Sequence, residues 1–452
     1  MFLRQIILVF LFSSAVAQNP VCLFQPTNSP IYFWTLNTDT GDFNNDAIVD
    51  FLSPNNGGFD LRLSNGWGTY LAPTNFTFNS YYTRVKSADF NNDNNNDVIG
   101  IPPADSNFII IWRGNGAGSF TSVTTYSVYG PSELTIADFN NDGNKDLAII
   151  NKPLNVFSVH LGNGTGGFTF ANSYNLNNAS YGLTQSDFNN DGNKDLAVCS
   201  NSSINIFRGY GNGTFSLVTT ISTTVINLES TDINNDNKSD LIAIDPTHSM
   251  LKIIKASNNF SFFPIQTYTM TGGANIWSFS YADFNYDNQK DLVAIDANVS
   301  GSVFVNNGSG NFPTQSAFSY TPYGFPTSRV FASKMNADNK PDLFITSDNS
   351  SQLSVLLNCN ITDLHENISS NVGLKLYPNP TSNMIYLDTE AFPEYTNGQI
   401  LSNTGQVFLE FSLDKNNKKI LLDLHEIPSG FYLVKLTQSS TQTVTKRLII
   451  SR

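Results

Sequence analysis

Short apolar runs of four to six residues, separated by clusters of turn-forming residues, fill the chain from about residue 24 to residue 358. Typical runs are Asp146–Ile150 and Asp291–Ile295, which each open with an aspartate and continue with apolar residues. The 3.6-residue period of an amphipathic helix is almost absent. The pattern predicts about four β-strands in every 49 residues, with glycine-rich turns between them.

A motif of the form Asp-x-Asn-x-Asp-x-x-x-Asp recurs along this region. Its six intact copies start 45 to 51 residues apart, at Asp42, Asp89, Asp138, Asp187, Asp232 and Asp283. A seventh copy is degenerate, since it starts with Lys334 and keeps Asn336, Asp338 and Asp342. Recurrence at such a period indicates a repeat architecture, and four short strands per repeat are typical of one propeller blade. The sequence therefore predicts an all-β fold with a seven-bladed β-propeller.

The two ends of the repeat region complement each other. Phe24 lies 18 residues before Asp42, and Phe120, which opens a fourth strand, lies 18 residues before Asp138. Cys22–Phe24 therefore occupies the place of an outermost strand, whereas the seventh repeat ends at Cys359 without one. We predict that the two ends complete one blade, which places Cys22 and Cys359 on neighbouring strands where a disulfide can form. Two free thiols are the alternative, and Cys199 is expected to be an inert core residue.

The segment Asp-Phe-Asn-Asn-Asp-Gly-Asn-Lys-Asp-Leu occurs at Asp138–Leu147 and again at Asp187–Leu196. It resembles the FG-GAP/VCBS repeat family, whose calcium-loop blades also form the head of integrin α chains. The resemblance covers residues 24–358. It implies a seven-bladed propeller with one ion per intact loop on a single rim.

The loop chemistry favours calcium. Three carboxylates and one amide at positions 1, 3, 5 and 9 are hard oxygen ligands, which suit Ca²⁺ better than zinc or magnesium. We expect about six calcium ions, bound by Asp42, Asn44, Asp46, Asp50, Asp89, Asn91, Asp93, Asp97, Asp138, Asn140, Asp142, Asp146, Asp187, Asn189, Asp191, Asp195, Asp232, Asn234, Asp236, Asp240, Asp283, Asn285, Asp287 and Asp291. The alternative is a network of Asx turns without metal, which the mutual repulsion of close carboxylates disfavours.

A loop of this kind needs a left-handed residue at position 6. Gly143 and Gly192 suit that position, and three other loops carry asparagine there. Ala47 does not suit it, so the first loop is expected to be the weakest. The seventh loop is expected to hold no calcium, because Lys334 replaces the first aspartate.

Charge agrees with a metal role for the acidic residues. The whole chain of 452 residues has a formal net charge of −13, which argues against nucleic acid as a partner and provides no polybasic membrane patch. Residues 18–370 contain 15 Lys+Arg and 30 Asp+Glu, and the six intact loops hold 6 × 3 = 18 of those acids. Six Ca²⁺ would change the charge of this part from −15 to −3.

The first 17 residues read as a secretory signal peptide. Arg4 precedes the apolar run Ile6–Phe12, and Ala15–Ala17 is a small-x-small cleavage site. The run is too short to span a bilayer, and no later stretch qualifies. We assign residues 1–17 to the signal peptide, 18–360 to the propeller and 361–372 to a polar linker.

Residues 373–452 form a separate β-rich segment, predicted to be a small sandwich of six or seven strands. Its landmarks are Tyr377–Ser382, Asn403–Gln406, Pro428–Val434 and Thr445–Ile450. In sequence and order they resemble the type A sorting domain of the type IX secretion system of Bacteroidetes. The resemblance implies contact with that secretion machinery and export across the outer membrane. It also implies removal of this domain, with the rest retained at the surface or released.

No catalytic motif accompanies the repeats. There is no Gly-x-Ser-x-Gly elbow, His-Glu-x-x-His or P-loop, and the Gly-Asn-Gly runs read as hairpin turns. His160 and His248 are expected to be satisfied or surface residues. Of the four tryptophans, one or two are candidates for a sugar platform: Trp34, Trp67, Trp112 and Trp277.

The sequence thus favours a monomeric, secreted or surface-displayed, calcium-binding propeller that acts as a binding or adhesion module for an extracellular protein or glycan, without catalysis. The alternative is a polysaccharide lyase, a hydrolase or a lectin on the same propeller.

Overall fold

A computed structural model of the chain describes residues 27–30, 38–358 and 374–450, with gaps at 56, 67–68, 79–81, 83, 104, 177–179, 201, 272–274, 297–299, 321–328, 337–339, 348–351, 378, 380, 390–394, 403–406, 415–418, 429 and 440–441. The predicted signal peptide and linker lie outside the described residues, as do Cys22, Trp34, Trp67, Asp338 and Cys359.

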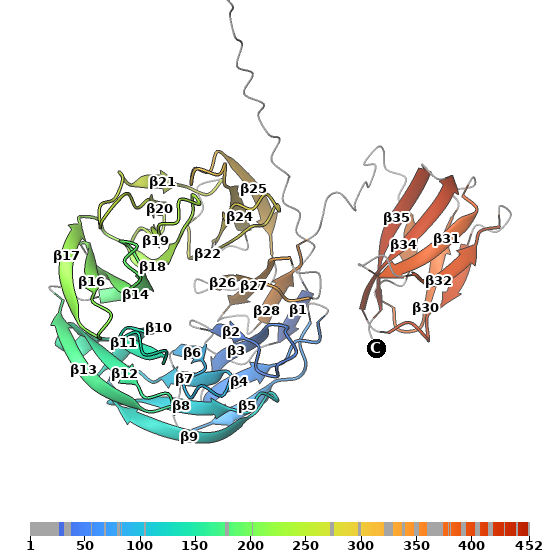
Figure 1. Cartoon of the computed structure of the whole chain (residues 1–452). Coiled ribbons are helices and arrows are strands. Elements are labelled where there is room, and N and C mark those ends of the chain that lie inside the picture. Colours follow the sequence, from blue (N-terminus) through green and yellow to red (C-terminus); the bar gives the residue numbers. More distant parts are fainter. Residues whose placement is uncertain are drawn as a thin grey trace, which may run out of the picture.

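The described part of the chain is all-β, apart from one 3₁₀ turn (Lys152–Leu154). Seven four-stranded antiparallel sheets are arranged as a ring (Figure 1). Six of them use consecutive strands: β2 (Asp39–Gly41), β3 (Asp50–Asn55), β4 (Gly58–Arg62) and β5 (Thr74–Thr77); β6 (Arg84–Ala88), β7 (Asp97–Ile101), β8 (Phe108–Gly114) and β9 (Phe120–Ser127); β10 (Pro131–Ala137), β11 (Asp146–Asn151), β12 (Val156–Gly162) and β13 (Phe168–Asn175); β14 (Ser180–Ser186), β15 (Asp195–Ser200), β16 (Ile204–Gly209) and β17 (Phe215–Ile221); β18 (Ile226–Thr231), β19 (Asp240–Ile244), β20 (Leu251–Ile254) and β21 (Gln266–Tyr268); β22 (Ser278–Ala282), β23 (Asp291–Ile295), β24 (Ser300–Val305) and β25 (Thr314–Ser319).

The seventh sheet closes the ring as the sequence predicts. It combines β26 (Arg329–Ser333), β27 (Asp342–Ser347) and β28 (Gln352–Leu356) with β1 (Thr27–Pro30), which comes from the other end of the repeat region. Thr27 pairs with Val355, and Pro30 pairs with Gln352. Figure 1 shows β1 beside β28. The described closing strand is thus Thr27–Pro30, whereas Cys22–Phe24, the segment predicted for this role, lies outside the described residues.

The apolar core lies between neighbouring blades. The second strand of each blade is covered on both faces, so β11 and β23 are buried along their whole length. One cluster joins Phe139 and Phe157 of the third blade to Leu196 and Phe215 of the fourth. Because these strands have no solvent face, they appear in the sequence as continuous apolar runs rather than alternating ones. Cys199 is completely buried in such a cluster, as predicted.

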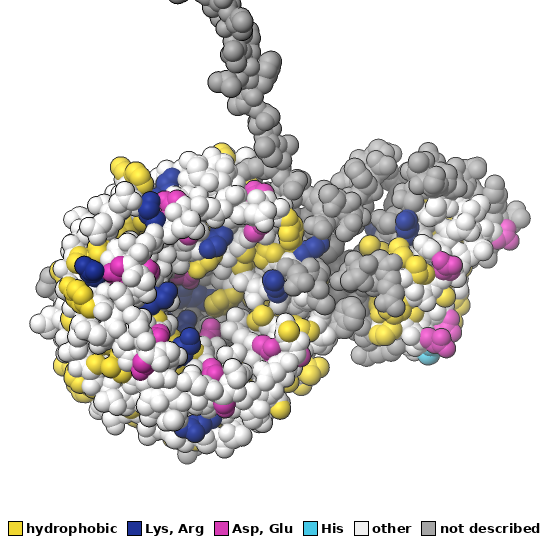
Figure 2. Space-filling model, viewed as in Figure 1, with side chains coloured by type: hydrophobic (Ala, Val, Ile, Leu, Met, Phe, Trp, Pro, Cys, Tyr) yellow, Lys and Arg dark blue, Asp and Glu magenta, His cyan; other side chains and the backbone are white. Residues whose placement is uncertain are grey.

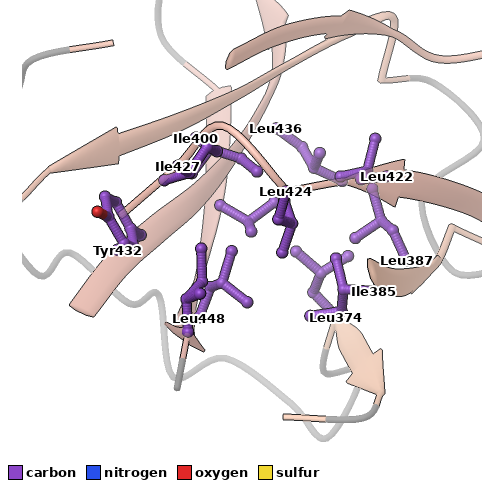
Figure 3. Packing of buried hydrophobic residues seen from close by; sticks show 12 residues of the cluster. Leu374, Ile385, Leu387, Ile400, Leu422, Leu424, Ile427, Tyr432, Leu436 and Leu448 are labelled. Atoms are coloured by element: carbon purple, nitrogen blue, oxygen red, sulfur yellow. The ribbon is translucent and has the colours of Figure 1, made fainter. Parts of the chain in front are cut away.

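The C-terminal unit is a sandwich of two antiparallel sheets. One contains β29 (Lys375–Tyr377), β30 (Met384–Asp388) and β33 (Lys419–Asp423), and the other contains β31 (Asn397–Ser402), β32 (Val407–Ser412), β34 (Gly430–Ser439) and β35 (Gln442–Ile450). Figure 3 shows Ile385 and Leu387 of the first sheet packed against residues such as Ile400 and Leu436 of the second. The seven strands agree with the predicted small sandwich.

The described residues include no helix that is long and apolar enough to cross a membrane.

Candidate metal-binding loops

The predicted loops each connect the innermost strand of a blade to its second strand. In the third blade, the loop runs from Asp138 to Asp146, between β10 and β11. Both oxygens of Asp138 accept hydrogen bonds from loop backbone N–H groups, from Asp142 at 3.2 Å and from Gly143 at 2.8 Å. Asn140 donates from its side chain to Asp142 Oδ2 at 2.9 Å, and the N–H of Asn144 donates to Asp142 Oδ1 at 2.8 Å. The carboxylates thus stabilise the turn itself.

The aspartate at position 9 has a different environment from the other three ligand candidates. Asp146 is completely buried. Its Oδ2 accepts the N–H of Phe139 at 2.7 Å, and its Oδ1 accepts the N–H of Gly162 at 2.7 Å. This carboxylate therefore joins the loop to the end of the third strand. The same pair of bonds recurs in every blade, at Asp50, Asp97, Asp146, Asp195, Asp240, Asp291 and Asp342.

Burial changes the acidity of these carboxyl groups. It raises the pKa to about 6 for Asp50, Asp97, Asp146 and Asp240, and to about 7 for Asp195 and Asp291. The two backbone N–H donors on each carboxyl group lower its pKa, and the nearby loop carboxylates raise it. Burial is the largest effect, so the pKa stays above its usual value. A cation bound beside the loop would favour the ionised form.

Each intact loop contains two left-handed residues rather than the one predicted. Position 6 has a positive φ in all six, including 86° at Gly143 and 65° at Ala47. Ala47 thus adopts the conformation that its side chain disfavours. Position 4 is also left-handed in all six loops, at Asn45, Asn92, Asn141, Asn190, Asn235 and Tyr286. The sequence carries a signal for this second site, because asparagine is the non-glycine residue that most readily takes this conformation.

Neighbouring loops are joined to each other through positions 4 and 7. Asn92 donates from its side chain to Asn144 Oδ1 of the next loop at 2.7 Å, and Asn141 donates to Asn193 Oδ1 at 2.8 Å. Equivalent bonds connect Asn45 with Asn95 and Asn235 with Gln289. Between the sixth and seventh loops, the ammonium of Lys340 lies 5.9 Å from the ring centre of Tyr286.

The glycine-rich hairpins cover these contacts between loops. Gly164 has φ 68°, and a Cβ there would lie 2.4 Å from Asn144 Oδ1 and 2.9 Å from Asn92 Nδ2. Gly116 and Gly211 lie in the same way over the corresponding amide pairs. The Gly-Asn-Gly segments are therefore hairpin turns, as expected. The last glycine leaves room for the amide pair in the first two segments, and the first glycine, Gly211, does so in the third.

The oxygen atoms that the loops offer are of the type that binds a hard cation. Positions 1, 3 and 5 carry exposed or half-buried oxygen-bearing side chains, apart from the buried Asn285, and position 9 adds a buried carboxylate. Among the described residues, however, no three acidic, histidine or cysteine side chains converge closely enough to enclose a metal ion.

The remaining candidate residues have mostly structural roles. His160 is buried, with Nδ1 2.7 Å from the Tyr126 hydroxyl and Nε2 2.8 Å from the Ser158 hydroxyl, and burial lowers its pKa to about 4. Trp112 is buried and donates to the Tyr82 hydroxyl at 3.0 Å. Trp277 is only half-buried.

Comparison with protein families supports the assignment of the repeats and of the C-terminal domain. Residues 89–149, 187–230 and 232–294 match the FG-GAP-like repeat, and residues 375–451 match the secretion system C-terminal sorting domain. The chain contains FG-GAP-like repeats and a C-terminal secretion sorting domain. That domain indicates export through type IX secretion to the cell surface or beyond it, and contact with the secretion machinery.

Two crystals of one complex share the fold of this chain, with TM-scores above 0.5. BBS1N, solved in complex with ARL6DN, matches with a TM-score of 0.52 at 9% identity, over 74% of this chain and 96% of its own. A second crystal of that complex gives a TM-score of 0.53 at 10% identity, over 78% and 99%. An Agrocybe aegerita lectin that recognises non-reducing terminal N-acetylglucosamine gives 0.49 at 16% identity, over 70% and 87%. No curated protein sequence matches.

Proposed function

We propose that this exported propeller is a calcium-stabilised binding or adhesion module that recognises an extracellular partner without catalysing a reaction. The observation that carries the proposal is the closed ring of seven similar blades on a chain that also bears a secretion sorting domain. A closed ring presents a rigid surface of many loops, which favours recognition.

Calcium would have a structural role in this proposal. Six loops carry the same four oxygen donors, and the position 9 carboxylates are buried with raised pKa values, which a bound cation would offset. In this view the side chains at positions 1, 3 and 5 turn toward the ion, while position 9 keeps its two backbone bonds.

Thermal unfolding tests the calcium role. Extracellular calcium modules bind at about 10⁻⁴–10⁻³ M, so 1 mM calcium should add roughly 0.4–1.4 kcal/mol per site. Six independent sites would add roughly 2–9 kcal/mol, and EDTA should lower the Tm accordingly. Magnesium at the same concentration is the control. Identical melting curves with calcium and with EDTA would remove calcium from the proposal.

Binding and turnover must be measured on the same preparation. The mature protein should bind components of a glycan array or of an extracellular protein panel, and that binding should weaken with EDTA. In parallel, polysaccharides should show no new reducing ends and no increase in absorbance near 235 nm, the signal of a lyase product. Turnover by the wild type that a point mutation on the rim opposite the Asp-rich loops abolishes would replace the binding role with an enzymatic one.

A further inference from the structure

The centre of the ring contains a cavity of about 890 Å³, lined by residues of the innermost strands β2, β6, β10, β14, β18, β22 and β26. Figure 2 shows the hollow at the centre of the ring, with charged side chains beside it. Its volume lies within the range of small-molecule and ligand pockets.

Four of the charged side chains in this channel are already engaged. Arg84 and Glu133, from neighbouring blades, form an ion pair. Asp39 accepts two hydrogen bonds from Ser87, from its N–H at 2.6 Å and from its hydroxyl at 2.9 Å. Arg329 also has a partner. The Arg84–Glu133 pair and the bonds from Ser87 to Asp39 join inner strands of neighbouring blades.

Glu229 and Lys86 differ from this group. Within the described part of the chain, neither side chain makes a hydrogen bond or an ion pair, and both side chains line the channel half-buried. Each lies three residues before the first position of its calcium loop, so they are at a similar depth on opposite blades. Burial raises the pKa of Glu229, and the positive charges of Lys86 and Arg329 only partly offset it. Two charged groups without bonded partners deep in a cavity indicate a site that a ligand completes.

An aromatic pair lies at the end of the channel away from the calcium loops. Trp277 immediately precedes β22, and its ring stacks on His248, with ring centres 4.2 Å apart and 27° between the planes. His248 Nδ1 donates to the carbonyl of Ile276 at 2.9 Å, which fixes the orientation of the ring. Both side chains line the cavity.

We propose that the central channel binds the end of an acidic oligosaccharide, with a sugar ring on Trp277, a uronate carboxylate at Lys86 and sugar hydroxyl groups donating to Glu229. The inference rests on the proposed binding role and assigns it a site and a ligand class. An aromatic face suits the apolar face of a pyranose, and a carboxylate suits hydroxyl donors. An ammonium without an ion pair favours a ligand that carries negative charge over a neutral one.

The test uses the full mature chain and three tetramers: tetragalacturonate, the neutral cellotetraose and tetraglutamate. Titration calorimetry in calcium should detect binding of tetragalacturonate, with at least tenfold weaker binding of the other two. Lys86→Gln and Trp277→Phe should each weaken binding of the uronate about tenfold. Lys152→Gln is the matched control, because Lys152 is exposed on the connection between β11 and β12 and does not line the channel. Circular dichroism and Tm should show that all variants fold.

The outcomes separate this inference from the proposed function. Binding of the uronate that is unchanged in both channel variants, or tighter binding of tetraglutamate, would overturn the site or the ligand class while the binding role stands. If none of the tetramers binds but the array shows other ligands, the ligand class is wrong and the module role remains. If neither assay detects binding, both proposals fall.

Discussion

Replacement of Gly164 by alanine should destabilise the propeller because it breaks a contact between two loops. Gly164 has φ 68°, and its Cα lies over the hydrogen bond between Asn92 and Asn144 of adjacent blades. A methyl group there would come within 2.4 Å of Asn144 Oδ1. Gly143 is a natural control, since it has φ 86° but a Cβ added there would meet no atom within 4 Å.

The two substitutions share one cost and differ in another. An alanine in the left-handed region costs about 1–2 kcal/mol, and this applies to both sites. At Gly164 the amide groups must also move apart, because they cannot keep their 2.7 Å bond beneath a methyl group. Both amides are exposed and can turn to water, so the added cost is the net value of one hydrogen bond, roughly 0.5–1.5 kcal/mol. We expect G164A to be less stable than G143A by about 1 kcal/mol.

Urea unfolding in saturating calcium measures this difference in stability. The decisive comparison repeats both glycine substitutions in a protein that also carries Asn92→Ala. Without the Asn92 side chain there is no bond for the methyl group to break, so G164A and G143A should cost the same in N92A protein. Equal costs in the wild-type background would show that the contact between loops contributes nothing. A difference that persists in N92A would show that its cause is another contact of Gly164.

Three further outcomes are expected. Metal analysis of the folded protein should approach six calcium ions per chain, and Lys334→Asp should add a seventh; seven ions in the wild type would contradict this. Between pH 7 and pH 4, wild type should lose up to about 3 kcal/mol of stability relative to H160Q, because folded His160 stays neutral down to a pKa of about 4 while an unfolded histidine takes up a proton near 6.5; a constant difference would refute the assignment. Non-reducing peptide mapping should recover Cys22 linked to Cys359, and a bridge that includes Cys199 would disprove the pairing.

The blades could be predicted from the sequence because the residues that determine each blade recur in every repeat. The aspartate at position 9 marks the start of the second strand in each blade. The apolar run after it reflects burial on both faces, as in β11 and β23. Closure could also be predicted, since a missing strand at one end matches an extra one at the other. The described strand of that blade is Thr27–Pro30, because pairing with β28 and not residue count determines the register.

The contacts between blades could not be predicted in the same way. Asn92 and Asn144 are 52 positions apart, and their separate roles in two loops give no sign that their amides bind each other. The central channel is a similar case. Glu229 and Lys86 lie on strands that are far apart in the sequence, and only closure of the ring brings them into one cavity. In the sequence, the inner strands have the pattern of ordinary half-buried strands and do not indicate a cavity.

The seventh blade separates the structural role of the loops from any metal role. Lys334 replaces the first aspartate there, yet Asp342 still accepts the N–H of Met335 at 3.1 Å and the N–H of Asn358 at 2.7 Å, as the equivalent aspartates do in the other blades. The same carboxylate frame therefore forms without the full set of ligand candidates. Position 9 is retained in all seven blades because it joins the loop to the third strand, whereas positions 1, 3 and 5 are free to specialise for an ion. A blade can therefore keep its place in the ring without the first aspartate of its loop.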